Sequence, residues 1–120
     1  MFEIIFHETS NEKCPIEEFL DDLETKMNAK MVGILEILQE KGNALREPYT
    51  KHLDDGIFEV RAKVGSDISR VMFFFVHGKR IILTNGFIKK TNKTPIGEID
   101  LAKKYRDDYL ERLGKDENIK

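Results

Sequence analysis

Three runs of β-branched and aromatic residues follow one another in the second half of the chain, and they limit the folds open to it. The runs cover residues 57–64, 68–77 and 81–88, and they are separated by short Gly-Ser-Asp and Gly-Lys-Arg breaks. Runs of this kind, joined by short glycine-containing connections, are typical of antiparallel hairpins. The sequence therefore predicts a three-stranded meander. The middle run is apolar on both faces, which favours a central strand covered on both sides.

Positive charge is concentrated in this meander, although the chain as a whole is mildly acidic. Residues 57–93 contain eight lysines and arginines against two acidic residues, in a chain with a formal net charge of −2. On the first strand Arg61 and Lys63 fall on one face, about 7 Å apart. A locally basic sheet attracts polyanions. It equally fits a solvated face paired with acidic helices, and charge alone leaves both interpretations open.

The remaining segments predict one strand and several helices around the meander. Residues 2–7 form a short apolar run typical of a strand. Helical periodicity runs from Pro15 to about Glu40, either as one helix or as two with a break near Asn28. A last helix is expected to begin at Thr94-Pro95 and to end at Gly114.

These elements occur in the order β-α-α-β-β-β-α, which predicts an α+β fold. We expect an antiparallel sheet of about four strands, with two N-terminal helices and one C-terminal helix packed on it. Residues 45–56 are predicted to form a loop that leads into the meander. The length of 120 residues fits one domain, which we place at residues 1–113, with residues 114–120 as a flexible polar tail.

Several kinds of chemistry are disfavoured by the motifs that the chain lacks. It has no glycine-rich phosphate loop, and its three histidines lack metal-ligand spacing, so we expect neither a metal nor another cofactor. The single cysteine, Cys14, excludes an internal disulfide; its place at a helix start could lower its pKa, although a structural role is the more common one. No apolar run is long enough to cross a bilayer, and the expected location is the cytoplasm.

A set of basic residues on the meander remains as the candidate site. Arginine binds phosphate through paired donors. Cleavage of RNA by its own 2′-hydroxyl needs in-line positioning and stabilisation of charge on phosphorus-bound oxygens. A lysine among other cations can also exchange protons. A binding face without catalysis is the alternative. The candidate residues are Arg61, Lys63, Arg70, Lys89, Lys90 and Lys93.

Three segments carry a resemblance to a known group of proteins. They are residues 53–61 (LDDGIFEVR), 69–74 (SRVMFF) and 83–95 (LTNGFIKKTNKTP), followed by Glu98-Ile99 and Ala102. Together they resemble the phage-derived branch of the RelE/HigB/ParE toxin superfamily. The phrase Gly-Phe-x-Lys-Lys-Thr-x-Lys-Thr-Pro is the most specific part, and the similarity spans nearly the whole domain. The resemblance implies a RelE-like fold and the toxin of a type II toxin–antitoxin pair.

The resemblance also implies an activity, partners and residue roles. Many such toxins are ribosome-dependent mRNA endonucleases that a helix-turn-helix antitoxin holds inactive. The implied catalytic residues are Arg61, Arg70, Lys89 and Lys90, with Lys63 and Lys93 as contacts to the RNA backbone. Some relatives use a late tyrosine or histidine as an acid or base. Here Tyr105 and Tyr109 have a spacing that favours packing, so no general acid is assigned.

Two other functions remain open at this point. ParE-type relatives inhibit DNA gyrase, and a non-catalytic module could use the same basic sheet to bind a nucleic acid or an acidic protein. The oligomeric state is not predicted.

Overall fold

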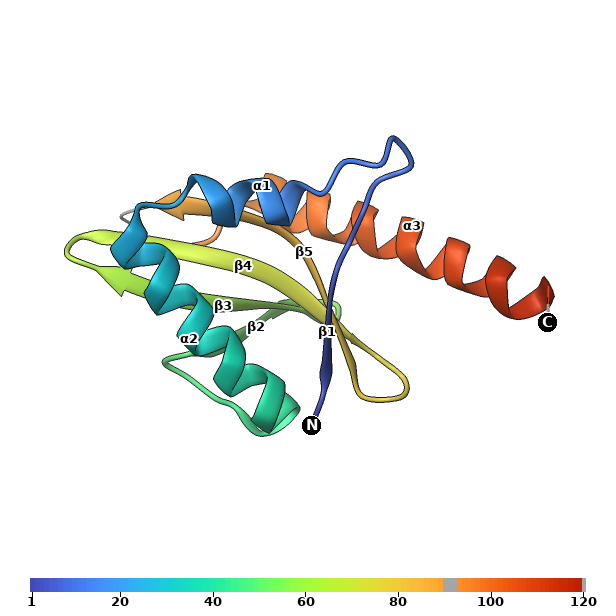
Figure 1. The fold of residues 1–120 in the computed structure, drawn as a ribbon, viewed down its shortest axis with the longest axis horizontal. Helices are drawn as coiled ribbons and strands as arrows, with labels where there is room; N and C mark the ends of the chain where they lie inside the picture. The colour runs from blue at the N-terminus through green and yellow to red at the C-terminus, as the bar shows by residue number, and fades with distance from the viewer. Residues whose placement is uncertain (90–92, 120) are drawn as a thin grey trace.

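The computed structural model describes residues 1–89 and 93–119, with residues 116–119 described by their backbone alone. Within these residues five strands form one mixed sheet in the order β1-β5-β4-β3-β2 (Figure 1). The strands are β1 (Glu3–Phe6), β2 (Thr50–Asp54), β3 (Ile57–Val64), β4 (Asp67–Val76) and β5 (Arg80–Lys89). The helices are α1 (Pro15–Asp22), α2 (Thr25–Lys41), the short 3₁₀ helix η1 (Gly42–Ala44) and α3 (Ile96–Ile119).

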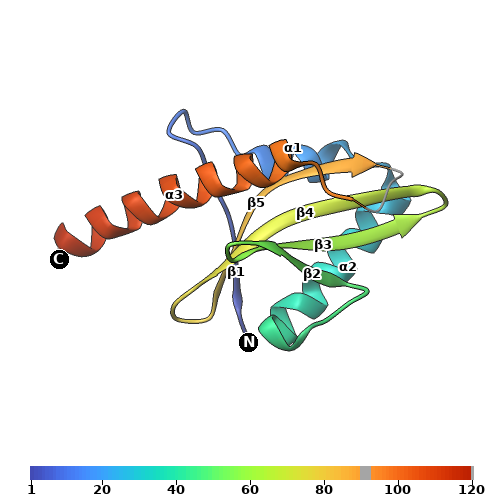
Figure 2. The same ribbon diagram turned by 180° about the vertical axis from the view of Figure 1, so that it is seen from behind.

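The predicted meander is confirmed, and β4 is its central strand. It pairs antiparallel with β3 on one side and with β5 on the other. Helices α1 and α2 cover one face of the sheet, whereas α3 crosses the other (Figures 1 and 2). Val71 and Phe73 of β4 belong to the core under α1 and α2, whereas Met72 and Phe74 belong to the core under α3. Both faces of β4 are buried, which explains its continuous apolar sequence.

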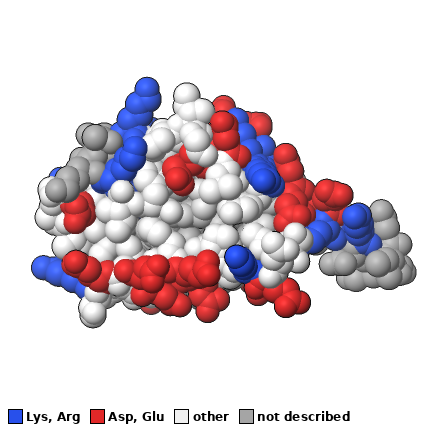
Figure 3. All heavy atoms as spheres, turned by 90° about the horizontal axis from the view of Figure 1, so that it is seen from above, with Lys and Arg blue, Asp and Glu red and all other residues white. Residues whose placement is uncertain are grey.

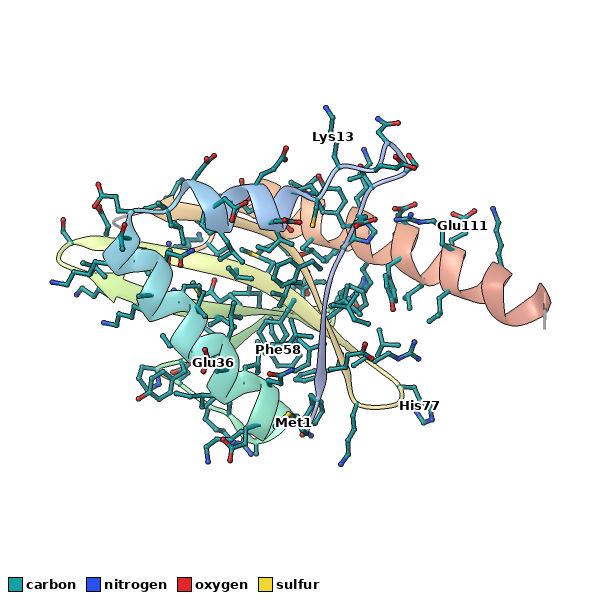
Figure 4. The ribbon with its side chains drawn as sticks, in the orientation of Figure 1. Met1, Lys13, Glu36, Phe58, His77 and Glu111 are labelled. Carbon is teal, nitrogen blue, oxygen red and sulfur yellow. The ribbon has the colours of Figure 1, made fainter. Side chains whose placement is uncertain are left out.

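Aromatic rings fill the core between α2 and the sheet. Phe58 of β3 points into this space (Figure 4). Its ring centroid lies 5.5 Å from that of Phe73 and 5.3 Å from that of Phe75. Aromatic pairs at such separations stabilise a core beyond their buried area. These contacts join β3 to β4 and hold the strand that carries Glu59 and Arg61 in register.

The predicted fold class is confirmed, but the loop expected at residues 45–56 contains a fifth strand. Strand β2 pairs antiparallel with the start of β3. Its sequence, Thr-Lys-His-Leu-Asp, is polar and mostly exposed because it lies at the sheet edge, so it lacks the apolar alternation of a strand. Asp55 and Gly56 join the two strands with φ values of 47° and 79°. An Asp-Gly pair with positive φ angles is typical of a tight hairpin turn.

The first strand also differs from the expectation of an antiparallel sheet. Strand β1 pairs parallel with β5, and Ile4 lies opposite Ile81. Helices α1 and α2, the 3₁₀ helix η1 and three strands separate β1 from β5 in the chain. A connection that contains helices lets the chain return to the same end of the sheet. The apolar pattern of residues 2–7 shows that a strand forms, but it contains no information on the partner or its direction.

Helix boundaries differ from the predicted ones at three places. The break between α1 and α2 falls at residues 23–24 rather than near Asn28. Helix α3 begins at Ile96, after Thr94-Pro95, and continues through Gly114 to Ile119. A glycine in a helix costs only about 1 kcal/mol, and Lys115 and Glu111 form an i,i+4 ion pair across it. The tail predicted at residues 114–120 is therefore helical where its backbone is described, and its last residue lies outside the described part.

Gly86 marks a β-bulge and a close approach between α1 and the sheet. Thr84 and Asn85 lie between the pairs Val71–Gly86 and Phe73–Leu83, so that two residues of β5 face one residue of β4. A Cβ atom at Gly86 would lie 2.5 Å from the ring of Phe19 and 2.9 Å from the carbonyl oxygen of Arg70. The absence of a side chain here lets α1 pack closely on β5.

No helix in the described part of the chain combines the length and the apolar character that crossing a bilayer requires.

The contrast between two glycines provides a test of this packing. Gly86→Ala should destabilise the protein by about 1–3 kcal/mol, because the ring of Phe19 and the backbone of Arg70 must move away from the added methyl group. Gly33→Ala, at an open position inside α2, should stabilise it by about 0.5–1 kcal/mol. Urea unfolding followed by circular dichroism measures both changes. Equal effects of the two substitutions would contradict the close packing at Gly86.

Candidate functional site

Four of the predicted basic residues share the sheet face on which α3 lies. Arg61 of β3 is directly opposite Arg70 of β4. In the next row Ile68 of β4 lies between Lys63 of β3 and Lys89 of β5. Directly paired residues of antiparallel strands point to the same face. The pairing therefore brings Lys89 to the face that the sequence assigned to Arg61 and Lys63, with the outer strands about 10 Å apart.

A buried carboxylate lies at the centre of this face. Glu59 of β3 is fully buried, and it accepts a hydrogen bond from Nε of Arg61 and another from the hydroxyl of Thr94. Nε of Arg70 lies 3.8 Å from Oε1 of the same carboxylate. Burial of a charged group is unfavourable unless charges and hydrogen bonds compensate it. Glu59 therefore joins β3, β4 and the start of α3 through one set of contacts.

Arg70 lies inside the protein rather than at its surface. Its side chain is fully buried, and its guanidinium carbon lies 5.4 Å from the ring centroid of Phe87. Burial lowers the pKa of Arg70, and the positive charge of Arg61 lowers it further, whereas Glu59 raises it. A guanidinium stays protonated despite such shifts. In this conformation Arg70 supports the positions of Glu59 and Arg61 from within the sheet.

The other predicted residues lie at the surface where the structure describes them. The side chain of Arg61 is 22% exposed. Lys63, Lys89 and Lys93 are exposed. Lys90 lies outside the described residues. The structure thus places one partly exposed arginine and two lysines on the same sheet face, with a third lysine directly before Thr94.

Acidic side chains are concentrated on the outer side of α1. The exposed side of α1 carries Glu17, Glu18, Asp21 and Asp22. Figure 3 shows a continuous band of aspartate and glutamate side chains along the border of the molecule where α1 lies. Helix α1 covers the sheet face opposite to that of Arg61. The acidic outer side of α1 and the basic residues of β3 and β5 thus lie on opposite sides of the sheet.

Glu59 and Thr94 are functional candidates that the sequence did not indicate. In the sequence Glu59 is one of two acidic residues among eight basic ones in residues 57–93, and Thr94 was expected to cap the last helix. In the structure the Thr94 hydroxyl donates to Glu59 instead. The available signal was the spacing Glu-x-Arg on a strand, which places a carboxylate beside a guanidinium on one face.

A second polar cluster joins β1 to α3, and it was also missed. His7 is buried, with Nε2 3.1 Å from Oδ2 of Asp108, and Asp108 accepts a hydrogen bond of 2.7 Å from Arg112. The rings of Tyr105 and Tyr109 pack against His7, with centroids 5.3 and 6.1 Å away, which confirms the packing role expected for both. Burial lowers the pKa of His7, and Asp108 opposes this shift in part.

A smaller expectation concerns Cys14, and His77 lies outside the site. The position of Cys14 at the start of α1 was expected to lower its pKa. Instead burial raises the pKa of this thiol; the backbone hydrogen bond from Glu17 in the first turn of α1 lowers it, but burial and the nearby carboxylates of Glu17 and Glu8 outweigh that effect. His77 lies in the turn between β4 and β5, away from the sheet (Figure 4). Within the described residues no three His, Cys, Asp or Glu side chains are grouped as a metal site requires.

The fold and the charged face define a small α+β protein with a cluster of basic residues on an antiparallel meander. The family described as Phage derived protein Gp49-like (DUF891) matches residues 18–107, which is most of the chain. The chain therefore belongs to this phage-derived family, which is related to the toxins of toxin–antitoxin systems. Among the curated proteins none matches the chain.

Removal of the central carboxylate should weaken the whole domain. In Glu59→Gln the buried guanidinium of Arg70 loses its nearest described negative charge, and the expected loss is about 3–5 kcal/mol in the free energy of unfolding. Urea unfolding measures the change. Glu36→Gln, an exposed position on α2, should alter stability by less than about 0.5 kcal/mol. A loss at Glu59 no larger than that at Glu36 would show that the cluster does not stabilise the fold.

The buried histidine should make stability depend on pH. The unfolded chain binds a proton on His7 near pH 6.5, whereas the folded chain does so only at lower pH. Stability is therefore retained above pH 6.5 and falls as the pH decreases below it, by at most about 1.4 kcal/mol per pH unit. Unfolding at pH 7.5 and at pH 5.5 should show this loss in the parent chain and in His77→Gln. His7→Gln should lack it, and an unchanged pH dependence in that variant would refute the assignment.

Proposed function

We propose that this chain is the toxin of a type II toxin–antitoxin pair and that it cleaves mRNA on the ribosome. The observation that carries the proposal is the row of Arg61 and Arg70 beside Lys63 and Lys89 on a single sheet face. Membership of a family related to such toxins supports it. The ribosome and mRNA are then its targets in the cytoplasm, and the proposed inhibitor is a helix-turn-helix antitoxin.

The proposed reaction uses the RNA's own 2′-hydroxyl as the nucleophile. This oxygen attacks the adjacent phosphorus, the bond to the 5′-oxygen breaks, and a 2′,3′-cyclic phosphate and a 5′-hydroxyl end form. The protein then contributes position and charge, which act most strongly in a site with fixed dipoles and ions. Negative charge that develops on the phosphate oxygens is balanced by cations on the sheet face.

Each residue has a separate part in this proposal. Arg61 contacts the scissile phosphate, because it is partly exposed while Glu59 fixes its Nε. Arg70 acts from below, since its buried charge holds Glu59 and Arg61 in place. Lys89 and Lys90 neutralise phosphate charge or exchange a proton. Lys63 and Lys93 bind the RNA backbone.

Substitution of Arg61 tests the proposal most directly. Induced expression of the parent chain should arrest growth and produce new mRNA 5′ ends that depend on translation. Arg61→Ala should lower the cleavage rate by roughly 100-fold, as the loss of one preorganised donor does. Arg80→Ala is the matched control. Arg80 lies at the end of β5 opposite to Lys89, where its side chain donates hydrogen bonds to the carbonyl of His77. Sequencing of RNA 5′ ends before and after induction measures the effect.

The same cultures separate the competing functions. Inhibition of gyrase would change the distribution of plasmid topoisomers and leave mRNA intact. A binding module without catalysis would leave both unchanged. Growth arrest that persists in Arg61→Ala at the level of the parent chain would refute the proposed role of the basic face.

A further inference from the structure

The basic face continues into a hollow at the open edge of β3. Strand β2 pairs with β3 only as far as Val60, opposite Thr50. Beyond this point lies a pocket of about 250 Å³ between β3, α2 and the segment that leads into β2. Its walls combine apolar side chains with cations from separate elements. The residues used below are Lys30, Pro48, Tyr49, Arg61, Lys63 and Ile68.

The side chain of Tyr49 lines this pocket, on a backbone that hydrogen bonds hold in place. Tyr49 is 43% exposed, whereas most other phenylalanine and tyrosine rings of the described residues are buried or half-buried; Phe6, at 37%, is also exposed. The backbone of Tyr49 is held at both ends. The amide of Arg61 donates a 2.9 Å hydrogen bond to the carbonyl of Tyr49, and the amide of Tyr49 donates a 3.1 Å bond to the carbonyl of Arg46. Pro48 and Ile68 add apolar surface beside the ring.

The cations of the pocket are placed around this apolar surface. Lys63 is exposed on β3, and Arg61 belongs both to the pocket and to the row that faces Arg70. Lys30 reaches over from α2, and its ammonium group donates to the carbonyl of Lys63 at the unpaired edge of the strand. An aromatic and apolar wall bordered by positive charges matches a nucleotide, because the base stacks and the phosphates pair with cations.

We infer that this pocket binds one unstacked nucleobase of a single-stranded RNA, with the base on Tyr49 and its flanking phosphates at Lys30, Arg61 and Lys63. The pocket volume is sufficient for a purine or pyrimidine ring. From the pocket the RNA strand passes directly to the row of Arg61 and Arg70. The pocket therefore positions the phosphate next to the bound base. This inference rests on the proposed function, and it adds a base-binding subsite to the proposed cleavage site.

Direct binding of a non-cleavable probe tests the inference. The probe is a short 2′-deoxy single strand, which lacks the nucleophile, and a second probe has an abasic site at its centre. Fluorescence anisotropy with the full chain should show tighter binding of the complete strand. Tyr49→Ala should weaken that binding by roughly 5- to 100-fold and remove the preference over the abasic probe. Tyr49→Phe should keep both, because the ring remains.

The charged contacts give a second readout that does not depend on stacking. Binding of a single strand weakens as salt increases, and each lost phosphate contact makes the plot of log affinity against log salt less steep by about 0.7. Lys63→Ala and Lys30→Ala should each show this less steep salt dependence, whereas Tyr49→Ala should keep the salt dependence of the parent chain. Lys41→Ala is the matched control, since it lies at the far end of the same helix as Lys30.

The outcomes distinguish this inference from the proposed function. Equal binding of the complete and abasic probes, or unchanged binding by Tyr49→Ala, overturns the base pocket while Arg61-dependent mRNA cleavage stands. Competition by an acidic peptide as strong as by the complete strand also overturns it, because the surface then recognises charge alone. The inference is supported if the mRNA cleavage positions change in Tyr49→Ala and stay the same in Tyr49→Phe.

Discussion

The arrangement of the site depends on the interactions of the Glu59 carboxylate with its neighbours. This carboxylate is fully buried, and it contacts Arg61, Arg70 and Thr94, which come from β3, β4 and the segment before α3. A buried charge of this kind keeps its partners close, since separation would leave it without compensation in a medium of low polarity. The same contacts set the direction of Arg61 and hold the start of α3 against the sheet. Stability and the geometry of the proposed phosphate site are therefore linked.

The two faces of the sheet have different roles because their coverings differ. Helices α1 and α2 bury one face in an apolar and aromatic core, and the outer side of α1 is acidic. On the other face α3 covers one region, and the rows of Arg61 and Lys63 occupy the rest. The small net charge of the chain thus conceals a basic region on β3 and β5 and an acidic outer side of α1. Local charge, rather than the net value, determines where a polyanion binds.

Much of the fold could be predicted because its signals are local. The apolar run of β4 predicted a central strand with two covered faces, and the alternation in β3 placed Arg61 and Lys63 together. The failures in the sheet were non-local. Strand β2 is polar because it lies at an edge, and only its pairing with β3 makes it a strand. The end predicted at Gly114 was wrong for a local reason, because a single glycine costs only about 1 kcal/mol in a helix and α3 continues to Ile119.

The sequence by itself determined the meander, the α+β class, the concentration of positive charge at residues 57–93 and the family motif. These depend on periodicity and residue type within short segments. Only the tertiary structure decided that Arg70 is buried rather than exposed, that Glu59 and Thr94 meet, and that Tyr49 and Lys30 border one pocket. Such contacts join residues far apart in the chain. They arise from strand register and helix packing, which no local pattern encodes.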